Sequence, residues 1–513
     1  MGVLDFAVLG AYFVGIVAVG LWFGRGERNT NDYFLGGRKQ HWFLAGVSII
    51  ATEVSALTYV GVPADSFRGD WTYLQMYFGS FVGRVLIVFL LLPAFYGGAV
   101  TTVYEYLGQR FGPWTRTTAA LMFFVSRILG SGIRLLAGSM ALAVVFDWPL
   151  SWVVIGSAGA AILYASIGGI KAILWTDLFQ ASLVVCGALA VVVFIFAVTP
   201  GGWWETLAAG SRAGKFHIFI WDWNPNNEKS LWVLFCHATV LNMAALGCDQ
   251  DLTQRMLTCR KLRQGQKSLM FNALAGFPIV CLFLLIGVLL FLYFQSLPAE
   301  SLPQTVLENK DRVFPFFIAN ALPANYGLRG LVVTAIFAAN MSTLASAVGA
   351  LSSSAVTDFY RPFIRRFVPG SQPSETHFLR AARGFSLLFG VLLIVVAMAF
   401  AKHDQLLWEA FKWASLLFGS MLGAFLLGVL TRRRGSDPVN TLAMLFSVAV
   451  LVWIKLHQET TGEVYIAWPW WVVIGTIWTF GFGACFRTTK VGTLRPVVAA
   501  TPTGAQIPYA EGG

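Results

Sequence analysis

The chain has 513 residues, of which 57% are hydrophobic and only 12% are charged, and its mean hydropathy is +0.68. These values exclude an ordinary soluble domain, which is about half apolar and about one quarter charged. The net charge of +11 would suit a nucleic-acid-binding protein, but the basic residues lie between apolar runs along the whole chain. We therefore predict a multi-pass membrane protein, embedded in a lipid bilayer and without a nucleic-acid partner.

Apolar runs of about 18 residues or more recur from end to end, each long enough to cross a hydrocarbon core of about 30 Å. We place thirteen spans at residues 3–24, 42–61, 72–97, 117–147, 150–168, 173–199, 230–248, 268–296, 328–357, 379–401, 405–430, 438–455 and 465–486. The first lacks the features of a cleaved signal peptide. With an outer N-terminus, the inside loops collect most of the 36 Lys and Arg. The positive-inside rule thus predicts an outer N-terminus and a cytoplasmic C-terminus in the cell membrane.

The second span contains "SIIATEVSALTYVGVP", with Glu53 among small and hydroxyl residues. A charge at mid-membrane costs about 2.5–3.5 kcal/mol on insertion scales, so it must face protein, water or an ion. The nearby Gly and Pro predict an interrupted helix, whose freed carbonyls suit Na⁺. One alternative is a glutamate that only pairs with an arginine to hold helices together. Another makes Glu53 the proton site of a proton-coupled carrier.

Span 117–147 carries Arg127 and Arg134, seven residues apart on one helix face. Arg134 is expected near the bilayer centre, where it is a partner for Glu53, a ligand for a substrate carboxylate, or both. Arg127 is close enough to the surface for its side chain to reach the interface. Our hypothesis is that Glu53 and Arg134 line the substrate cavity.

Two further polar residues lie inside apolar spans. Asp177, in "GGIKAILWTDLFQ", either attracts cations on their way to the inside or anchors its helix at the interface. Asn242 lies in a second interrupted stretch, 239–247, and paired interrupted spans indicate the site of an inverted-repeat transporter. A lone intramembrane Asn also commonly serves as a helix–helix hydrogen bond.

The stretch "AIFAANMSTLASAVGALSSSAVTDFYRP" places Ala339, Ser342, Thr343 and Ser346 on one helix face. Its hydroxyl groups, with a backbone carbonyl, suit an oxygen shell around Na⁺. The alternative is a face of small residues for close helix packing, with hydroxyls bonded back to the preceding turn.

The sequence gives no sign of an enzyme. The six cysteines are scattered, so we expect neither disulfides nor a zinc site, and no nucleophile–base set or metal cluster is present. A transporter-like sensor fused to a kinase is a further alternative, but the chain ends about 25 residues after the last expected span. We expect this tail to be disordered.

Six stretches, in this order, resemble the sodium/solute symporter family: "NDYFLGGR", "ATEVSALTYVGVPADSF", "LPAFYGGAVTTVYEYLGQRF", "GGIKAILWTDLFQ", "GCDQDLTQRM" and "MSTLASAVGALSSSAVTDFYRP". The third is most similar to the iodide, monocarboxylate and multivitamin branch. The resemblance implies Na⁺-coupled symport of a small organic solute by alternating access. It also implies an all-α, LeuT-like fold of five plus five helices, with the first and sixth core helices broken.

The same resemblance implies how the chain is divided. Residues 1–41 form a leading helix and the first cytoplasmic loop, and residues 42–430 form the inverted-repeat core. Residues 431–486 add two helices, and residues 487–513 form the cytoplasmic tail. We expect the protein to work as a monomer.

Matched by motif, the resemblance also implies a sodium site. Its ligands are expected at Ala51, Val54, Ala339, Ser342 and Thr343. The family's second sodium site would use Asp177 and hydroxyls at the positions of Ala345 and Ser346. Because Ala345 has no side-chain oxygen, we expect one Na⁺ per cycle, with Asp177 and Ser346 on the ion exit path.

Substrate residues follow less directly from the resemblance. The positions that match substrate contacts of related carriers are Thr58, Gln75 and Asn242. Sugar carriers have an asparagine at the position of Glu53 and a gating tyrosine at that of Ala245, so a sugar is disfavoured. Arg134 falls near the carboxylate-binding arginine of sialic acid carriers. We therefore expect a carboxylate-bearing anion or a zwitterion.

Overall fold

The computed structural model describes residues 1–23, 30–199, 201–296, 310–367, 373–403 and 405–487. Its first helical segments are α1 (Val3–Phe23), α2 (Thr30–Leu35), η1 (Gly36–Arg38), α3 (Trp42–Glu53), α4 (Ala56–Arg68), η2 (Thr72–Leu74), α5 (Gln75–Leu86), η3 (Ile87–Leu91), α6 (Leu92–Gly97), α7 (Val103–Arg110), α8 (Pro113–Phe146), α9 (Leu150–Val198) and α10 (Gly202–Arg212). The remaining segments are α11 (Leu231–Gly247), α12 (Gln250–Leu257), α13 (Leu262–Gln295), η5 (Lys310–Arg312), α15 (Val313–Asn320), α16 (Leu328–Ser354), η6 (Ala355–Tyr360), α17 (Arg361–Phe367), α18 (Glu375–Ala399), α19 (Leu406–Leu430), α20 (Asp437–Thr461) and α21 (Trp470–Ala484). The expected tail lies outside the described residues, apart from its first residue.

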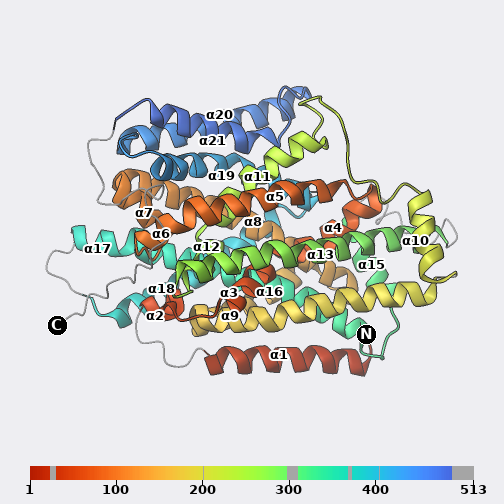
Figure 1. Ribbon diagram of the computed structural model, residues 1–513. Helices are drawn as coiled ribbons and strands as arrows, with labels where there is room; N and C mark the ends of the chain where they lie inside the picture. Colours follow the sequence, from red (N-terminus) through yellow and green to blue (C-terminus); the bar gives the residue numbers. More distant parts are fainter. Residues whose placement is uncertain (24–29, 200, 297–309, 368–372, 404, 488–513) are drawn as a thin grey trace.

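The long helices run side by side in one bundle, with α1 on one flank and α19, α20 and α21 on the opposite flank (Figure 1). Among the described residues, nine helices are long and apolar enough to cross a membrane, or eleven if each of two bent pairs is one span. Two shorter apolar helices, Leu150–Ile162 and Trp470–Ala484, add to these. The predicted all-α, multi-pass architecture is therefore confirmed.

Two spans are broken, as the sequence predicts. Helices α3 and α4 meet at residues 54–55 with a bend of 56°, and α11 and α12 meet at residues 248–249 with a bend of 62°. At the second break the Asp249 side chain accepts a hydrogen bond from the Asp251 N–H at 2.8 Å, which caps the start of α12. This break lies just after the stretch 239–247 that the sequence indicated.

Helix α9 joins two expected spans at Gly169. The backbone there has φ 53° and ψ −169°, a conformation that only glycine adopts without strain. The chain therefore turns from one span into the next within a single continuous segment, and Asp177 begins its third turn after this kink.

Helix α16 lies at the centre of the bundle, where nearly all of its side chains are buried. It packs most extensively against α9 and also against α8, α1 and α18. Its face of small residues permits this close approach. The carboxylate of Asp5, in the first turn of α1, accepts hydrogen bonds from the N–H groups of Asn325 and Gly330, each at 3.0 Å. The start of α1 is thereby fixed to the start of α16.

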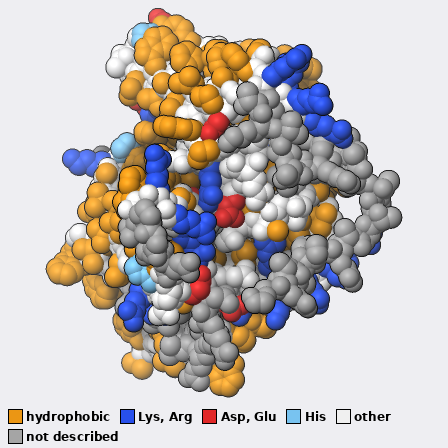
Figure 2. Space-filling model, turned by 90° about the vertical axis from the view of Figure 1, so that its left-hand side faces the viewer, with side chains coloured by type: hydrophobic (Ala, Val, Ile, Leu, Met, Phe, Trp, Pro, Cys, Tyr) orange, Lys and Arg blue, Asp and Glu red, His pale blue; other side chains and the backbone are white. Residues whose placement is uncertain are grey.

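One end of the bundle is rich in basic side chains. Helices α2, α7 and α17 lie at this end, and α10 lies at the other (Figure 1). Figure 2 looks onto the α17 end and shows Lys and Arg side chains gathered there, flanked by hydrophobic side chains. Exposed members of this basic group include Arg365 and Arg366 of α17.

Candidate functional site

The break between α3 and α4 changes the hydrogen bonding of the backbone. The Val54 N–H still bonds to the Ile50 carbonyl at 2.8 Å, but the Ser55 N–H bonds to the Glu53 carbonyl at 2.9 Å. In a continuous helix the Ser55 N–H would bond to the Ala51 carbonyl. The break thus frees the Ala51 carbonyl oxygen, which becomes available to a cation.

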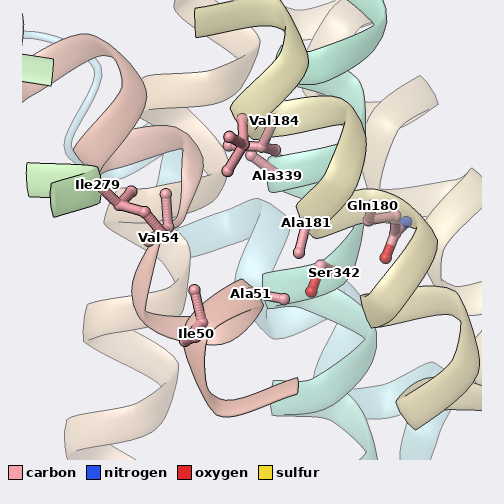
Figure 3. Close-up of a pocket in the computed structure, with 10 residues that line it drawn as sticks. Ile50, Ala51, Val54, Gln180, Ala181, Val184, Ile279, Ala339 and Ser342 are labelled. Atoms are coloured by element: carbon pink, nitrogen blue, oxygen red, sulfur yellow. The ribbon is translucent and has the colours of Figure 1, made fainter. Parts of the chain in front are cut away.

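Four of the five expected sodium ligands line one small cavity beside this break. They are Ala51 and Val54 from the break and Ala339 and Ser342 from α16 (Figure 3). The cavity measures about 10 Å³, which is close to the space that one water molecule needs. It therefore has room for a single small ion and not for an organic solute.

The hydroxyl groups of Ser342 and Thr343, on α16, are oriented so that their oxygen lone pairs remain available to a cation. Ser342 donates its proton to Asp177 Oδ1 at 2.5 Å, and Thr343 donates to the Ala339 carbonyl at 3.0 Å. A hydroxyl that donates its proton elsewhere keeps lone pairs for a cation. With the Ala51 carbonyl, these groups form an oxygen-only set that suits Na⁺. Among the described residues, no group of three or more His, Cys, Asp or Glu side chains could hold a metal ion.

Asp177 is completely buried, 0% exposed, and sits between three helices. It accepts hydrogen bonds from Ser342 and from Ser48 of α3, and it lies 3.4 Å from Nη2 of Arg255 in α12. Its proposed role as an anchor at the membrane interface is therefore wrong, because its partners belong to the interior. The hydroxyl of Ser346 bonds to Asp251 at 3.2 Å instead of to Asp177.

A buried charge network continues from Asp177 to α8. Arg255 donates through Nε to Ser48 at 2.8 Å and through Nη1 to Asp251 Oδ1 at 2.5 Å. Arg127 lies 2.5 Å from Asp249 and 3.0 Å from Asp251. The expectation that Arg127 reaches the membrane interface is wrong, because its side chain is 5% exposed and is drawn inward by the two carboxylates. The network ties α3, α8, α9 and α12 together next to the second break, where Asp249 caps α12.

Glu53 has a different partner from the one expected. Nη2 of Arg84, in α5, lies 2.8 Å from Glu53 Oε1, and Asn272 of α13 donates to Glu53 Oε2 at 2.6 Å. Arg84 also donates to Asn272 at 2.9 Å. The pairing of Glu53 with Arg134 is therefore wrong, because α5 supplies a buried arginine at the break. The alternative in which Glu53 joins helices through an arginine describes this contact.

Arg134 forms no ion pair with any residue that the structure describes, although it is only half-buried within the bundle. One turn further along α8, Gly138 lies against Ala56 and Asn340: a Cβ built there would stand 2.8 Å from Ala56 Cβ and 2.6 Å from Asn340 Cγ. Only a glycine permits this approach of α8 to the first break. Arg134 lies one turn earlier on this helix, where its Nη1 would be 3.7 Å from a Cβ built at Gly130.

The remaining expected substrate residues have backbone partners. Thr58 donates to the Glu53 carbonyl at 3.0 Å, and Asn242 donates to the Ala238 carbonyl at 2.9 Å. Gln75 is fully buried; its amide donates to the Lys229 carbonyl at 3.0 Å and accepts from the Ile220 N–H at 3.1 Å. Its polar atoms are thus occupied by the loop before α11, and it is not among the residues that line the ion cavity.

Sequence reasoning missed several residues of these networks. Arg84 stands alone in an apolar span, and this is itself a signal of an intramembrane partner. Asp249, Asp251 and Arg255 belong to the stretch "GCDQDLTQRM", from which the sequence predicted no site residue, and all three are buried. A break in a helix brings its flanking polar residues into the protein interior, which hydropathy alone does not reveal.

The sequence profile described as "Sodium:solute symporter family" matches residues 33–437. The chain belongs to this family. It is therefore a sodium-coupled membrane transporter, as the motif resemblance implied, and the members that it resembles are transporters and not enzymes.

The relatives of this symporter carry several solutes. It is 28% identical to the sodium/sialic acid symporter NanT of Aliivibrio fischeri, over 93% of this chain and 91% of that one. It is 27% identical to human sodium-coupled monocarboxylate transporter 2, over 83% of this chain and 68% of that one. The human sodium/iodide cotransporter is 26% identical over 83% and 66% of the two chains.

Solved structures support the same assignment. A Na⁺-coupled sialic acid symporter, in a substrate-bound outward-open state, superposes with a TM-score of 0.81 at 26% identity, covering 94% of this symporter and 97% of that chain. The nucleobase-cation-symport transporter Mhp1 superposes with a TM-score of 0.53 at 12% identity, covering 88% and 93%. The second likeness shows the fold alone.

Proposed function

We propose that this symporter carries a small carboxylate-bearing anion or zwitterion together with Na⁺. The observation that carries the proposal is the half-buried guanidinium of Arg134, which has no carboxylate partner among the described residues and belongs to α8, the helix whose Gly138 packs against the first break. An arginine in this setting matches a carboxylate with two parallel hydrogen bonds. Relatives that carry sialic acid and monocarboxylates support an anionic solute.

The sodium site that we propose is the cavity beside the break. Its ligands are the carbonyls of Ala51, Val54 and Ala339 and the hydroxyls of Ser342 and Thr343. The freed Ala51 carbonyl and the small volume of the cavity support this assignment. Thr343 lies in the same turn of α16 as Ser342, and its hydroxyl donates to the carbonyl of Ala339, another of the proposed ligands.

We propose that one Na⁺ moves in each cycle. The family's second site would need hydroxyls at the positions of both Ala345 and Ser346, but Ala345 has no side-chain oxygen and the Ser346 hydroxyl bonds to Asp251. Asp177 and Ser346 then belong to the path by which the ion leaves. The ion pair between Asp177 and Arg255 keeps this path closed until the charge network opens.

The contacts of Glu53 argue for a structural part in the site. Its carboxylate is bound by Arg84 and Asn272, so it orders the break. The remaining exposed part is 24% of its side chain. Thr58 supports the same break. Asn242 and Gln75 border the path of the solute through α11 and α5.

The proposed topology has thirteen spans, an outer N-terminus and a monomeric working unit. The eleven long spans and two shorter apolar helices support the number, and the basic α17 end supports a cytoplasmic position for that end (Figure 2). Residues 1–41, 42–430 and 431–486 then form the leading segment, the core and the added helices, with a cytoplasmic tail at 487–513.

A thermal-shift screen of the purified protein tests the solute class. Organic acids, amino acids and sugars are compared in NaCl and in choline chloride, because a ligand that binds only the native state raises its stability. We expect stabilisation by carboxylates in sodium alone. Stabilisation by sugars, or a sodium-independent response that follows pH, would overturn the proposal.

A further inference from the structure

Gln180 contributes an oxygen to the ion cavity that the expected ligand set lacks. Its side chain, one turn beyond Asp177 on α9, is 1% exposed and lines the cavity with Ala51 and Ser342. Figure 3 shows that Gln180 and Ser342 are the labelled side chains that carry oxygen, while the others are apolar. Gln180 is therefore a polar group at the ion position that has no part in the site described so far.

The leading helix holds the Gln180 amide in one orientation. Nε2 of Gln180 donates to the hydroxyl of Tyr12, in α1, at 2.9 Å. The Tyr12 hydroxyl directs its own proton to Met341 Sδ at 3.5 Å. Since Tyr12 accepts from the amide nitrogen, the amide oxygen of Gln180 points away from it.

That oxygen has no hydrogen-bond donor among the described residues, although it is buried. Buried carbonyl oxygens are nearly always satisfied, because leaving one without a partner is destabilising. The adjacent cavity of about 10 Å³ has room for one small species. The freed Ala51 carbonyl and the Ser342 hydroxyl border the same space, so a cation there satisfies all three oxygens at once.

We propose that the Gln180 side-chain oxygen is a further Na⁺ ligand and that Tyr12 is the positioning residue that aims it. This inference rests on the proposed sodium site. It makes α1, which precedes the five-plus-five core, a part of ion binding. The hydrogen bonds of Asp5 to Asn325 and Gly330 keep α1 in place beside α16.

The test is a sodium titration of purified full-length protein, without solute, read by tryptophan fluorescence. Gln180→Met keeps the side-chain volume and removes the oxygen; we expect its half-saturating sodium concentration to rise at least about tenfold. Gln180→Glu keeps an oxygen and should bind sodium within about threefold of the wild type. Tyr12→Phe should raise the half-saturating concentration about three- to tenfold. The double variant Tyr12→Phe/Gln180→Met should match Gln180→Met, because Tyr12 acts through Gln180.

Tyr96→Phe is the matched control, because its hydroxyl is also buried and bonds to the Met256 carbonyl at 2.7 Å, at the α6–α12 contact. It should leave the sodium response unchanged. If Gln180→Met and Tyr12→Phe both titrate like a responsive wild type, Gln180 is no ligand and the inference is overturned. A wild type that shows no sodium response would instead refute the sodium site itself.

Discussion

At the scale of single residues, the site depends on whether each buried arginine is paired with a carboxylate. Arg84, Arg127 and Arg255 each have a carboxylate within 3.0 Å among the described residues. Arg134 has none, and under the proposed function an incoming anion supplies the missing charge. This difference separates arginines that hold the helices together from the arginine that is available to a solute.

Replacing Arg134 by Gln should remove solute binding and leave sodium binding. Hydrogen bonds to charged groups contribute about 1.5–3 kcal/mol, so we expect solute affinity to fall at least about tenfold. The measurement is solute-dependent and sodium-dependent thermal stabilisation of the same preparation. Arg366→Gln, at an exposed site on α17, is the control, and unchanged solute affinity in Arg134→Gln would contradict the assignment.

Replacing Glu53 by Gln should destabilise the fold, because Arg84 then keeps its charge with no counter-charge. Breaking a fully buried pair costs about 3–5 kcal/mol; we expect about 1–3 kcal/mol here because Glu53 is 24% exposed. The measurement is the unfolding midpoint in detergent. Glu459→Gln, at a glutamate that is itself 56% exposed in its pair with Lys455, should lower it less, and the double variant Glu53→Gln/Arg84→Met should recover part of the loss.

At the scale of helices, we interpret the charge network at the second break as a closure. Arg127 joins α8 to both acidic residues that begin α12, and Arg255 joins α12 to α9 through Asp177. Alternating access needs these helices to separate so that the ion can leave. The network therefore stabilises the closed arrangement, and its loss should favour the inward-open one.

Arg127→Gln should open this closure. Cys248 lies at the second break and is 0% exposed, so its reaction with a maleimide reports opening. We expect its labelling rate to rise about tenfold, as for a shift of about 1.4 kcal/mol between two states, resolved by mass spectrometry from the other five cysteines. Arg366→Gln should leave the rate unchanged; equal rates in Arg127→Gln and the control would argue against a gate.

At the scale of the whole molecule, ion and solute act through one occluded core. The ion cavity lies between the first break and α16, while α8, which carries Arg134, packs against the same break at Gly138. Binding at either position therefore favours the same packing of α3, α8 and α16. This shared element is what couples the two ligands.

Sodium should raise solute affinity, and solute should raise sodium affinity by the same factor. Linkage requires this equality, and coupling factors of about 5–150 are typical. Calorimetric titrations of each ligand, with and without a saturating amount of the other, measure both factors. Potassium in place of sodium is the control, and a coupling factor of about one, with neither ligand changing the affinity of the other, would contradict a shared transition.

The sequence by itself determined the membrane class, the all-helical architecture and the family, and it predicted the positions that we propose as Na⁺ ligands. It could do so because apolar length, interrupted spans and i, i+3, i+4 spacing are local properties of the chain. The first break at Glu53 and the hydroxyl face of Ser342 and Thr343 were predicted in this way.

Only the tertiary structure decided which charges meet. Glu53 pairs with Arg84 and Asn272 instead of Arg134, because α5 and α13, far along the chain, pack against the break. The link from Tyr12 to Gln180 likewise joins residues 168 positions apart. Such partners follow from helix packing, and a single sequence does not encode it in any local pattern.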